Sequence, residues 1–151
     1  MFDLKKYILR FDAGGLIIFA IIMIPNLIWF AVPAGNDILR NDSITPEIDF
    51  VASIFQVIMV AALCLIKNEA YHKCKNQKWM INMVATIVIY FLGWCLYYGQ
   101  ITNAPVILIL CVAPCATFLI YSFGKKNGVA FVSAAIFMIC HLIYGYANFI
   151  C

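Results

Sequence analysis

Apolar residues along the chain gather into five long runs that short polar connections separate. The runs cover approximately residues 13–32, 50–66, 79–98, 102–123 and 129–150. Each run has about the 17–25 residues that an α-helix needs to cross the hydrocarbon core of a bilayer. Polar and apolar residues do not alternate as they do in a membrane barrel, and a helix satisfies its own backbone hydrogen bonds in lipid. The pattern predicts an all-α fold, an integral membrane bundle of five transmembrane helices.

The segment ahead of the first run has a second pattern. Its apolar residues recur at helical spacing, at Leu4, Tyr7, Ile8 and Phe11, and its basic residues fall on the other faces. We therefore expect a short amphipathic interfacial helix over residues 1–12, lying on the inner leaflet and followed by a transmembrane domain over residues 13–151.

A signal peptide is the alternative interpretation of this N-terminal region. Its basic start, apolar core and the segment Val32-Pro33-Ala34 would then form a cleavable leader. The apolar run of about 20 residues is long for the core of a signal peptide. Cleavage would leave four spans with unchanged orientation.

Composition and charge placement agree with a membrane protein. The chain is 66% apolar and 11% charged, with a mean hydropathy of +0.98, whereas about a quarter of the residues of a soluble domain are charged. Nine of the ten basic residues lie before the first run or in the second and fourth connections. The positive-inside rule then predicts a multi-pass protein of the cell membrane with a cytoplasmic N-terminus and an extracytoplasmic C-terminus. The lipid bilayer is the expected partner, and the absence of a basic stripe argues against nucleic acid.

Local signals mark two of the helix ends. Thr45-Pro46-Glu47 places a capping residue, a first-turn proline and an acid at the start of the second helix. Gly124 and Gly128 bracket a short turn, so we expect the last two helices to be antiparallel neighbours.

Each run has a stripe of small or polar residues, which membrane helices turn toward one another. The predicted interior positions are Gly15, Phe19, Ile22, Asn26, Pro33, Ala52, Ser53, Gln56, Cys64, Asn82, Thr86, Tyr90, Gly93, Cys111, Pro114, Cys115, Ser133, Phe137, His141, Tyr144 and Asn148.

Five of these residues, one from each run, lie at a common depth. Counted from the cytoplasmic ends at about 1.5 Å per residue, they fall roughly 15–20 Å into the membrane. They are Asn26, Gln56, Tyr90, Cys111 and His141. They are the candidate mid-membrane polar site, in which His141 would relay a proton or gate a pocket and the amides would contact a polar solute. The alternative is that these groups tie the helices together by hydrogen bonds.

The sequence does not favour a cofactor, a metal ion or a catalytic centre. A buried haem often takes a second axial ligand, but the only other histidine is in the segment His72-Lys73-Cys74, which is also too short for a metal site. The pair Cys111 and Cys115 does not have the CxxC spacing of a redox centre, and together with Cys64, Cys95 and Cys140 it is interpreted as small buried apolar groups. Motifs of nucleotide hydrolysis, zinc proteolysis and serine hydrolysis are missing from the chain.

Three short segments carry a resemblance. They are Ile24-Pro25-Asn26-Leu27-Ile28, Ala113-Pro114-Cys115 and Cys140-His141-Leu142-Ile143. They are similar to segments of a group of uncharacterised small polytopic membrane proteins of clostridia and other Firmicutes. The resemblance implies a bacterial membrane protein and carries no function with it.

Two hypotheses about function follow. The first is a non-enzymatic accessory or structural subunit of a membrane complex, whose partner is another membrane protein. The second is a small-solute or proton-coupled transporter, or a component of one, that uses the polar cluster around His141. A membrane enzyme acting on a lipid-linked or quinone substrate and a sensor or immunity-type protein are further alternatives.

Overall fold

The computed structural model describes residues 6–35, 37–69 and 78–150. Its main elements are five helices: α1 (Ala13–Ala31), α2 (Pro46–Leu65), α3 (Lys78–Tyr98), α4 (Ala104–Gly124) and α5 (Gly128–Phe149). All five are long and apolar enough to cross a membrane. The predicted all-α bundle of five membrane-spanning helices is therefore confirmed. The helix ends agree with the predicted apolar runs to within a residue or two, except that α2 begins at residue 46, four residues before its run and where Thr45-Pro46-Glu47 predicted the helix start.

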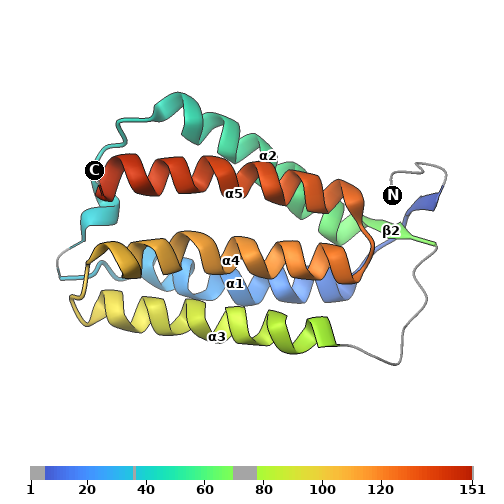
Figure 1. The fold of residues 1–151 in the computed structure, drawn as a ribbon, viewed down its shortest axis with the longest axis horizontal. Helices are drawn as coiled ribbons and strands as arrows, with labels where there is room; N and C mark the ends of the chain where they lie inside the picture. The colour runs from blue at the N-terminus through green and yellow to red at the C-terminus, as the bar shows by residue number, and fades with distance from the viewer. Residues whose placement is uncertain (1–5, 36, 70–77, 151) are drawn as a thin grey trace.

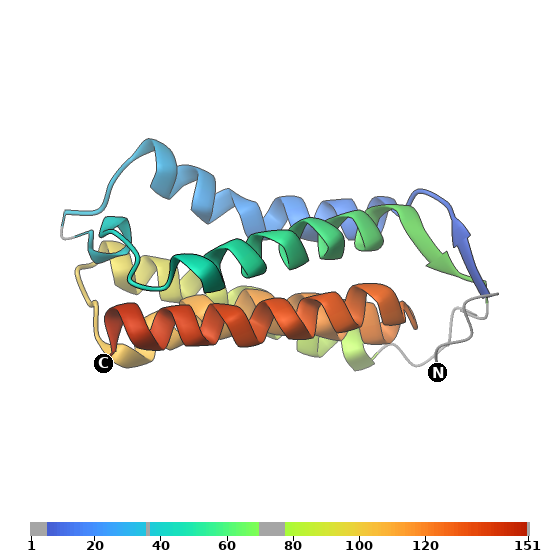
Figure 2. The same ribbon diagram turned by 90° about the horizontal axis from the view of Figure 1, so that it is seen from above.

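The helices run along one axis in two layers. Figure 1 shows α4 between α3 and α5, with α2 on the far side of α5. Figure 2 shows that α1 and α2 lie together in one layer over α3, α4 and α5. α4 buries the largest share of its surface, and it is the centre of the bundle.

Large apolar side chains also cover the outside of the bundle. Leu27, Phe30 and Val57 are 61%, 78% and 69% exposed, respectively. A soluble protein of this size does not expose apolar surface on every helix. These faces therefore contact the lipid of the bilayer.

The two ends of the bundle differ. One end carries a two-stranded antiparallel sheet of β1 (Tyr7–Leu9) and β2 (Ile66–Asn68); we call it the hairpin end. The other carries the connections α1–α2 and α3–α4 and the last turn of α5; we call it the C-terminal end. A short 3-10 helix, η2 (Ile38–Arg40), lies in the α1–α2 connection.

The sheet corrects the prediction of an amphipathic helix over residues 1–12. Residues 1–5 lie outside the described residues, and Tyr7–Leu9 is a strand. The backbone N–H groups of Arg10 and Asp12 donate to the carbonyls of Leu65 and Cys64, at 2.8 and 2.7 Å. The last carbonyls of a helix have no partner within the helix, so an extended segment that supplies donors to α2 is favoured over a separate helix.

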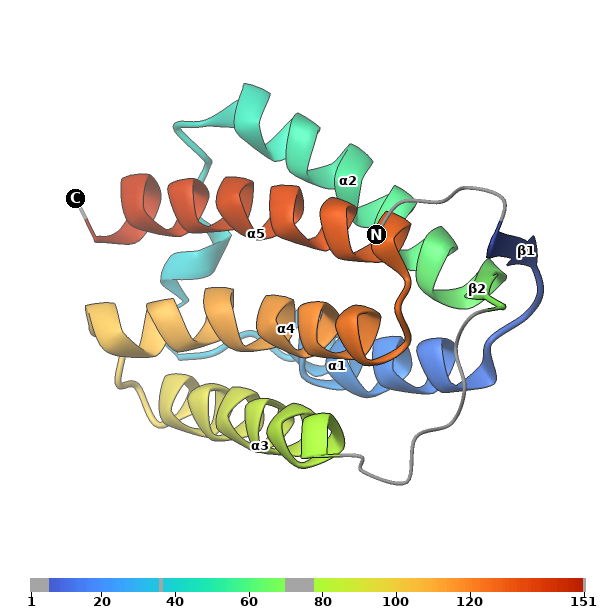
Figure 3. The ribbon, with the colours of Figure 1, turned by 45° about the vertical axis from the view of Figure 1, so that its right-hand side comes forward.

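The sheet packs against the turn that joins α4 to α5, as Figure 3 shows. The Lys126 carbonyl accepts hydrogen bonds from the Asn68 amide at 2.8 Å and from the Tyr7 hydroxyl at 3.5 Å. Asn127 donates to the Ile66 carbonyl at 2.9 Å and accepts from the N–H of Ala130, so it caps α5. The prediction that the last two helices are antiparallel neighbours is confirmed.

The predicted interior is largely correct, with a few exceptions. Pro33 and Asn82 are exposed, and so is Cys95, which we expected to be buried. Ser53 is also exposed, although it borders a cavity described below. Pro33 lies beyond the end of α1, and Asn82 lies one turn into α3, so both residues are near an end of the bundle.

Candidate functional site

A partly open cavity of about 440 Å³ lies inside the bundle, and all five helices line it. It brings together the five residues of the candidate mid-membrane site, Asn26, Gln56, Tyr90, Cys111 and His141. Each comes from a different helix. The volume is in the range of pockets that hold small molecules.

Aromatic side chains form the wall of the cavity on α5. His141 is stacked between Phe137 and Tyr144, with ring centroids 5.1 and 6.0 Å apart and interplanar angles of 21° and 15°. Phe149 continues the wall with an edge contact to Tyr144 at 5.4 Å. Phe137, His141 and Tyr144 follow one face of the helix because their spacings of three and four residues are close to whole helical turns.

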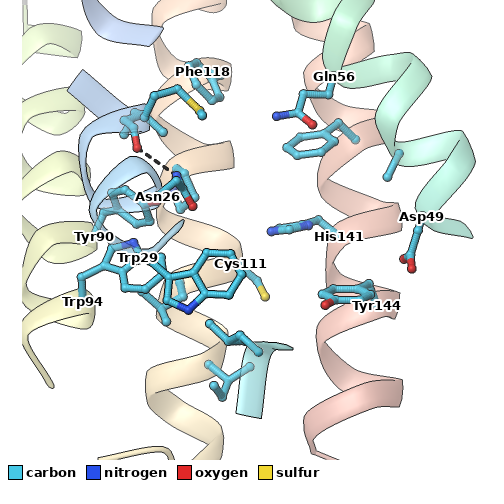
Figure 4. A pocket seen from close by; sticks show the side chains of 18 of the residues that line it. Asn26, Trp29, Asp49, Gln56, Tyr90, Trp94, Cys111, Phe118, His141 and Tyr144 are labelled. Atoms are coloured by element: carbon cyan, nitrogen blue, oxygen red, sulfur yellow. Dashed lines mark hydrogen bonds between the residues drawn. The ribbon is translucent and has the colours of Figure 1, made fainter. Parts of the chain in front are cut away.

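A second aromatic wall faces the first, from α1 and α3. Trp29 and Trp94 lie with ring centroids 6.2 Å apart, and Tyr90 meets Trp94 edge to face at 6.4 Å. Figure 4 shows these rings on one side of the cavity and His141 and Gln56 pointing toward them from α5 and α2. The Trp94 indole N–H is buried and makes no well-formed hydrogen bond with a described residue, although the Tyr90 hydroxyl lies nearby.

Asn26 and Tyr90 are joined to each other. The Asn26 amide donates to the Tyr90 hydroxyl at 2.7 Å and to the Ile22 carbonyl at 3.1 Å. This bond ties α1 to α3 at the depth of the cavity, which is the packing role that the sequence left open for polar residues there.

Gln56 and His141 differ from that pair. Within the part of the chain that the structure describes, neither side chain makes a hydrogen bond, and both border the cavity. A polar group deep in a membrane protein is costly unless something satisfies it. Water or a ligand in the cavity would satisfy the Gln56 amide and the His141 imidazole.

The cavity stops short of the hairpin end, because closely packed side chains fill the bundle between the two. Cys115, Ala130 and Ala134 lie in this packed layer and are all 0% exposed. The hydroxyls of Thr86 and Thr117 are 2.8 Å apart and join α3 to α4.

Toward the C-terminal end the lining continues as far as the helices do. It includes Asp49 in the first turn of α2, Phe149 in the last turn of α5 and Leu39 of the α1–α2 connection. Figure 2 shows α1 and α2 close together near the hairpin end and separated toward the C-terminal end. The cavity therefore extends from mid-bundle to the C-terminal end.

Asp49 also borders the cavity, although the sequence did not predict it as a site residue. The second apolar run begins at residue 50, so the acid was assigned to the connection before it. With Pro46 as the first helical residue, Asp49, Ser53 and Gln56 fall on one helical face, and all three border the cavity. The signal at Thr45 predicted this helix start correctly, and the face that carries Asp49 could have been derived from it. The Thr45 side chain makes no capping bond and instead accepts one from the Asn148 amide at 3.0 Å.

The α1–α2 connection folds over the C-terminal end around Asp37. The Trp29 indole N–H donates to both carboxylate oxygens at 2.9 Å, the Tyr97 hydroxyl donates at 2.7 Å, and the Arg40 guanidinium pairs with the carboxylate at 2.9 Å. Arg40 also lies 4.9 Å from the ring centre of Trp29. Burial alone would raise the pKa of Asp37, but these hydrogen bonds outweigh it and lower the pKa below its ordinary value.

A second cavity, of about 390 Å³, lies at the hairpin end. It is lined by charged side chains of both signs, among them Arg10, Asp12, Lys67, Glu69 and Lys125. Lys125 lies 4.0 Å from Asp12. This cavity is ionic where the first is aromatic, and the two do not share a residue.

The described residues contain no group of three or more His, Cys, Asp or Glu side chains that could hold a metal ion. His72 and Cys74 lie outside the described residues. The thiols of Cys111 and Cys115 are free and buried.

Comparison of the chain with protein-family models, with curated proteins and with solved structures finds no match. The resemblance to small clostridial membrane proteins stays a prediction. The function is therefore inferred from the geometry of the cavity.

Proposed function

We propose that this multi-pass membrane protein binds a small solute in the cavity between its five helices, as a transporter or as the solute-binding component of one. The cavity of about 440 Å³ carries this proposal, because each helix contributes one polar residue to it at mid-bundle. A bundle that only packs against a partner has no need of such a space.

The orientation belongs to the same proposal. The basic residues gather at the hairpin end, and the acidic α1–α2 connection is at the other end. By the positive-inside rule the hairpin end lies in the cytoplasm and the cavity opens to the outside. The packed layer between the cavity and the hairpin end would then close the cavity toward the cytoplasm.

The polar groups divide into two roles. Asn26 and Tyr90, already bonded to each other, hold α1 against α3. Gln56 and His141 keep free hydrogen-bonding capacity and would contact the solute. Cys111 adds a small side chain to the lining from α4 and leaves room for the solute.

An accessory role in a membrane complex remains the alternative, and a test must separate the two. Ala52 borders the cavity and is 7% exposed, so Ala52→Trp would fill part of the space from α2. A solute that binds only the folded protein raises its Tm. We expect at least one class in a panel of solutes to raise the Tm of the purified wild-type protein and to leave Ala52→Trp unchanged.

Ala20→Trp is the matched control for added bulk, because Ala20 is exposed on the lipid-facing side of α1. It should keep the solute response of the wild type. Equal shifts in wild type and Ala52→Trp, or no shift with any solute, would contradict solute binding in the cavity. Purification in a fixed ratio with a second membrane protein, without any solute response, would favour the accessory role.

A further inference from the structure

The charge of the cavity lining distinguishes between classes of solute. Among the described residues that border it, Asp49 is the only one with a full charge when His141 is neutral. Its carboxylate makes no hydrogen bond or ion pair with any described residue. It is close enough for its charge to act on both His141 and Tyr144.

The aromatic walls add a second preference. Rings from α1 and α3 face rings from α5 across the cavity, and the faces of aromatic rings attract cations. One such contact already exists at the C-terminal end, where the Arg40 guanidinium lies over Trp29.

The residues around the opening of the cavity are negatively charged, as Asp49 is. Asp42 and Glu47 are exposed in the α1–α2 connection and the first turn of α2, and Arg40, the only base there, is paired with Asp37. An acidic rim raises the local concentration of cations and lowers that of anions.

We propose that the solute is a largely apolar organic cation, whose charge is paired with Asp49 and whose body lies between the two aromatic walls. This inference rests on the proposed function, because it names the solute class for the same cavity. Gln56 and His141 would contact polar groups on such a solute, and the walls would replace its hydration shell with ring faces.

Tetraphenylphosphonium and tetraphenylborate test the charge preference directly, because they have nearly the same size and shape and opposite charge. Binding to the purified protein in uncharged detergent is followed by quenching of tryptophan fluorescence. Trp79 is replaced by Phe in all variants, so that only Trp29 and Trp94 at the cavity report. We expect the cation to bind at least tenfold more tightly than the anion.

Asp49→Asn should weaken binding of the cation about tenfold and leave the weak binding of the anion unchanged. Asp49→Glu should restore most of the affinity, which a loss of fold would not. The control is Glu69→Gln, which removes one negative charge at the hairpin end, away from both the lining and the acidic rim, and it should change the affinity less than twofold.

Equal affinity for the two probes, a preference for the anion, or an unchanged cation affinity in Asp49→Asn would overturn the cation assignment. Tighter binding of the anion than of the cation would overturn it while leaving solute binding intact. Loss of quenching by every probe in the wild type would overturn both proposals.

Discussion

At the scale of single residues, Asp37 is the most highly connected side chain at the C-terminal end. It accepts hydrogen bonds from α1, α3 and its own connection through Trp29, Tyr97 and Arg40. Trp29 also borders the cavity, so the network fixes the position of one aromatic wall. The Asp37 carboxylate therefore links the fold of the α1–α2 connection to the shape of the site.

Asp37→Asn should destabilise the protein at neutral pH by about 1–3 kcal/mol, because hydrogen bonds to a charged acceptor are stronger than those to a neutral amide. Thermal unfolding in detergent measures the change. Asp42→Asn is the control, since Asp42 is an exposed acid in the same connection. Equal effects of the two substitutions would contradict the special role of Asp37.

The lowered pKa of the Asp37 carboxyl predicts how the stability of the protein depends on pH. Its pKa in the folded protein lies below the ordinary value of 3.8. The stabilising contribution is thus present at pH values above about 4 and is lost as the pH falls through the folded pKa. The wild type should lose Tm on acidification below about pH 4 by more than Asp37→Asn does, and parallel losses in the two proteins would contradict this account.

At the scale of elements, the approach of α1 to α2 determines where the cavity begins. Gly15 packs directly against the Leu63 carbonyl of α2, and a Cβ atom at this position would overlap with that backbone. Beyond this crossing toward the C-terminal end the two helices separate. A glycine at one helical position therefore lets the hairpin end close while the other end stays open.

Gly15→Ala should push α1 and α2 apart and destabilise the bundle by about 1–3 kcal/mol, as overpacking does. Ala20→Val adds an even larger volume, two carbons instead of one, on the lipid-facing side of α1 and should change stability little. Unfolding of the two variants in detergent gives the comparison. If Gly15→Ala is as stable as the wild type, the close crossing is not what holds this end together.

The sequence predicted these helices well because length and apolarity are sufficient to define a membrane span. It failed at residues 7–9, where the unpaired carbonyls at the end of α2 determine the local structure, and these come from a distant part of the chain. It missed Asp49 as a lining residue although Thr45-Pro46-Glu47 placed the start of α2 correctly, because only the packing of α2 determines which residues of its first turn border the cavity.

At the scale of the whole molecule, the five polar residues chosen by depth do border one cavity. Counting residues along straight helices was enough for this, because the helices are nearly aligned. Phe137, His141 and Tyr144 of the α5 wall were predicted as interior positions. The facing wall and the packed layer toward the hairpin end could not be predicted, because they depend on how each helix is rotated and tilted against its neighbours. Trp29 and Trp94 were therefore missed, although both are on the cavity side of their helices.

The proposed function requires an aqueous cavity that reaches His141 from outside the cell. The most direct test is to place a single cysteine at His141 in a background without the native cysteines, and to label intact cells with a small membrane-impermeant thiol reagent. Ala134→Cys in the same background is the control, because Ala134 is fully buried two turns away on α5 toward the hairpin end. We predict labelling of His141→Cys from outside and no labelling of Ala134→Cys. If folded His141→Cys is not labelled from outside, or is labelled only after the cytoplasmic side is opened, the outward-facing cavity is contradicted.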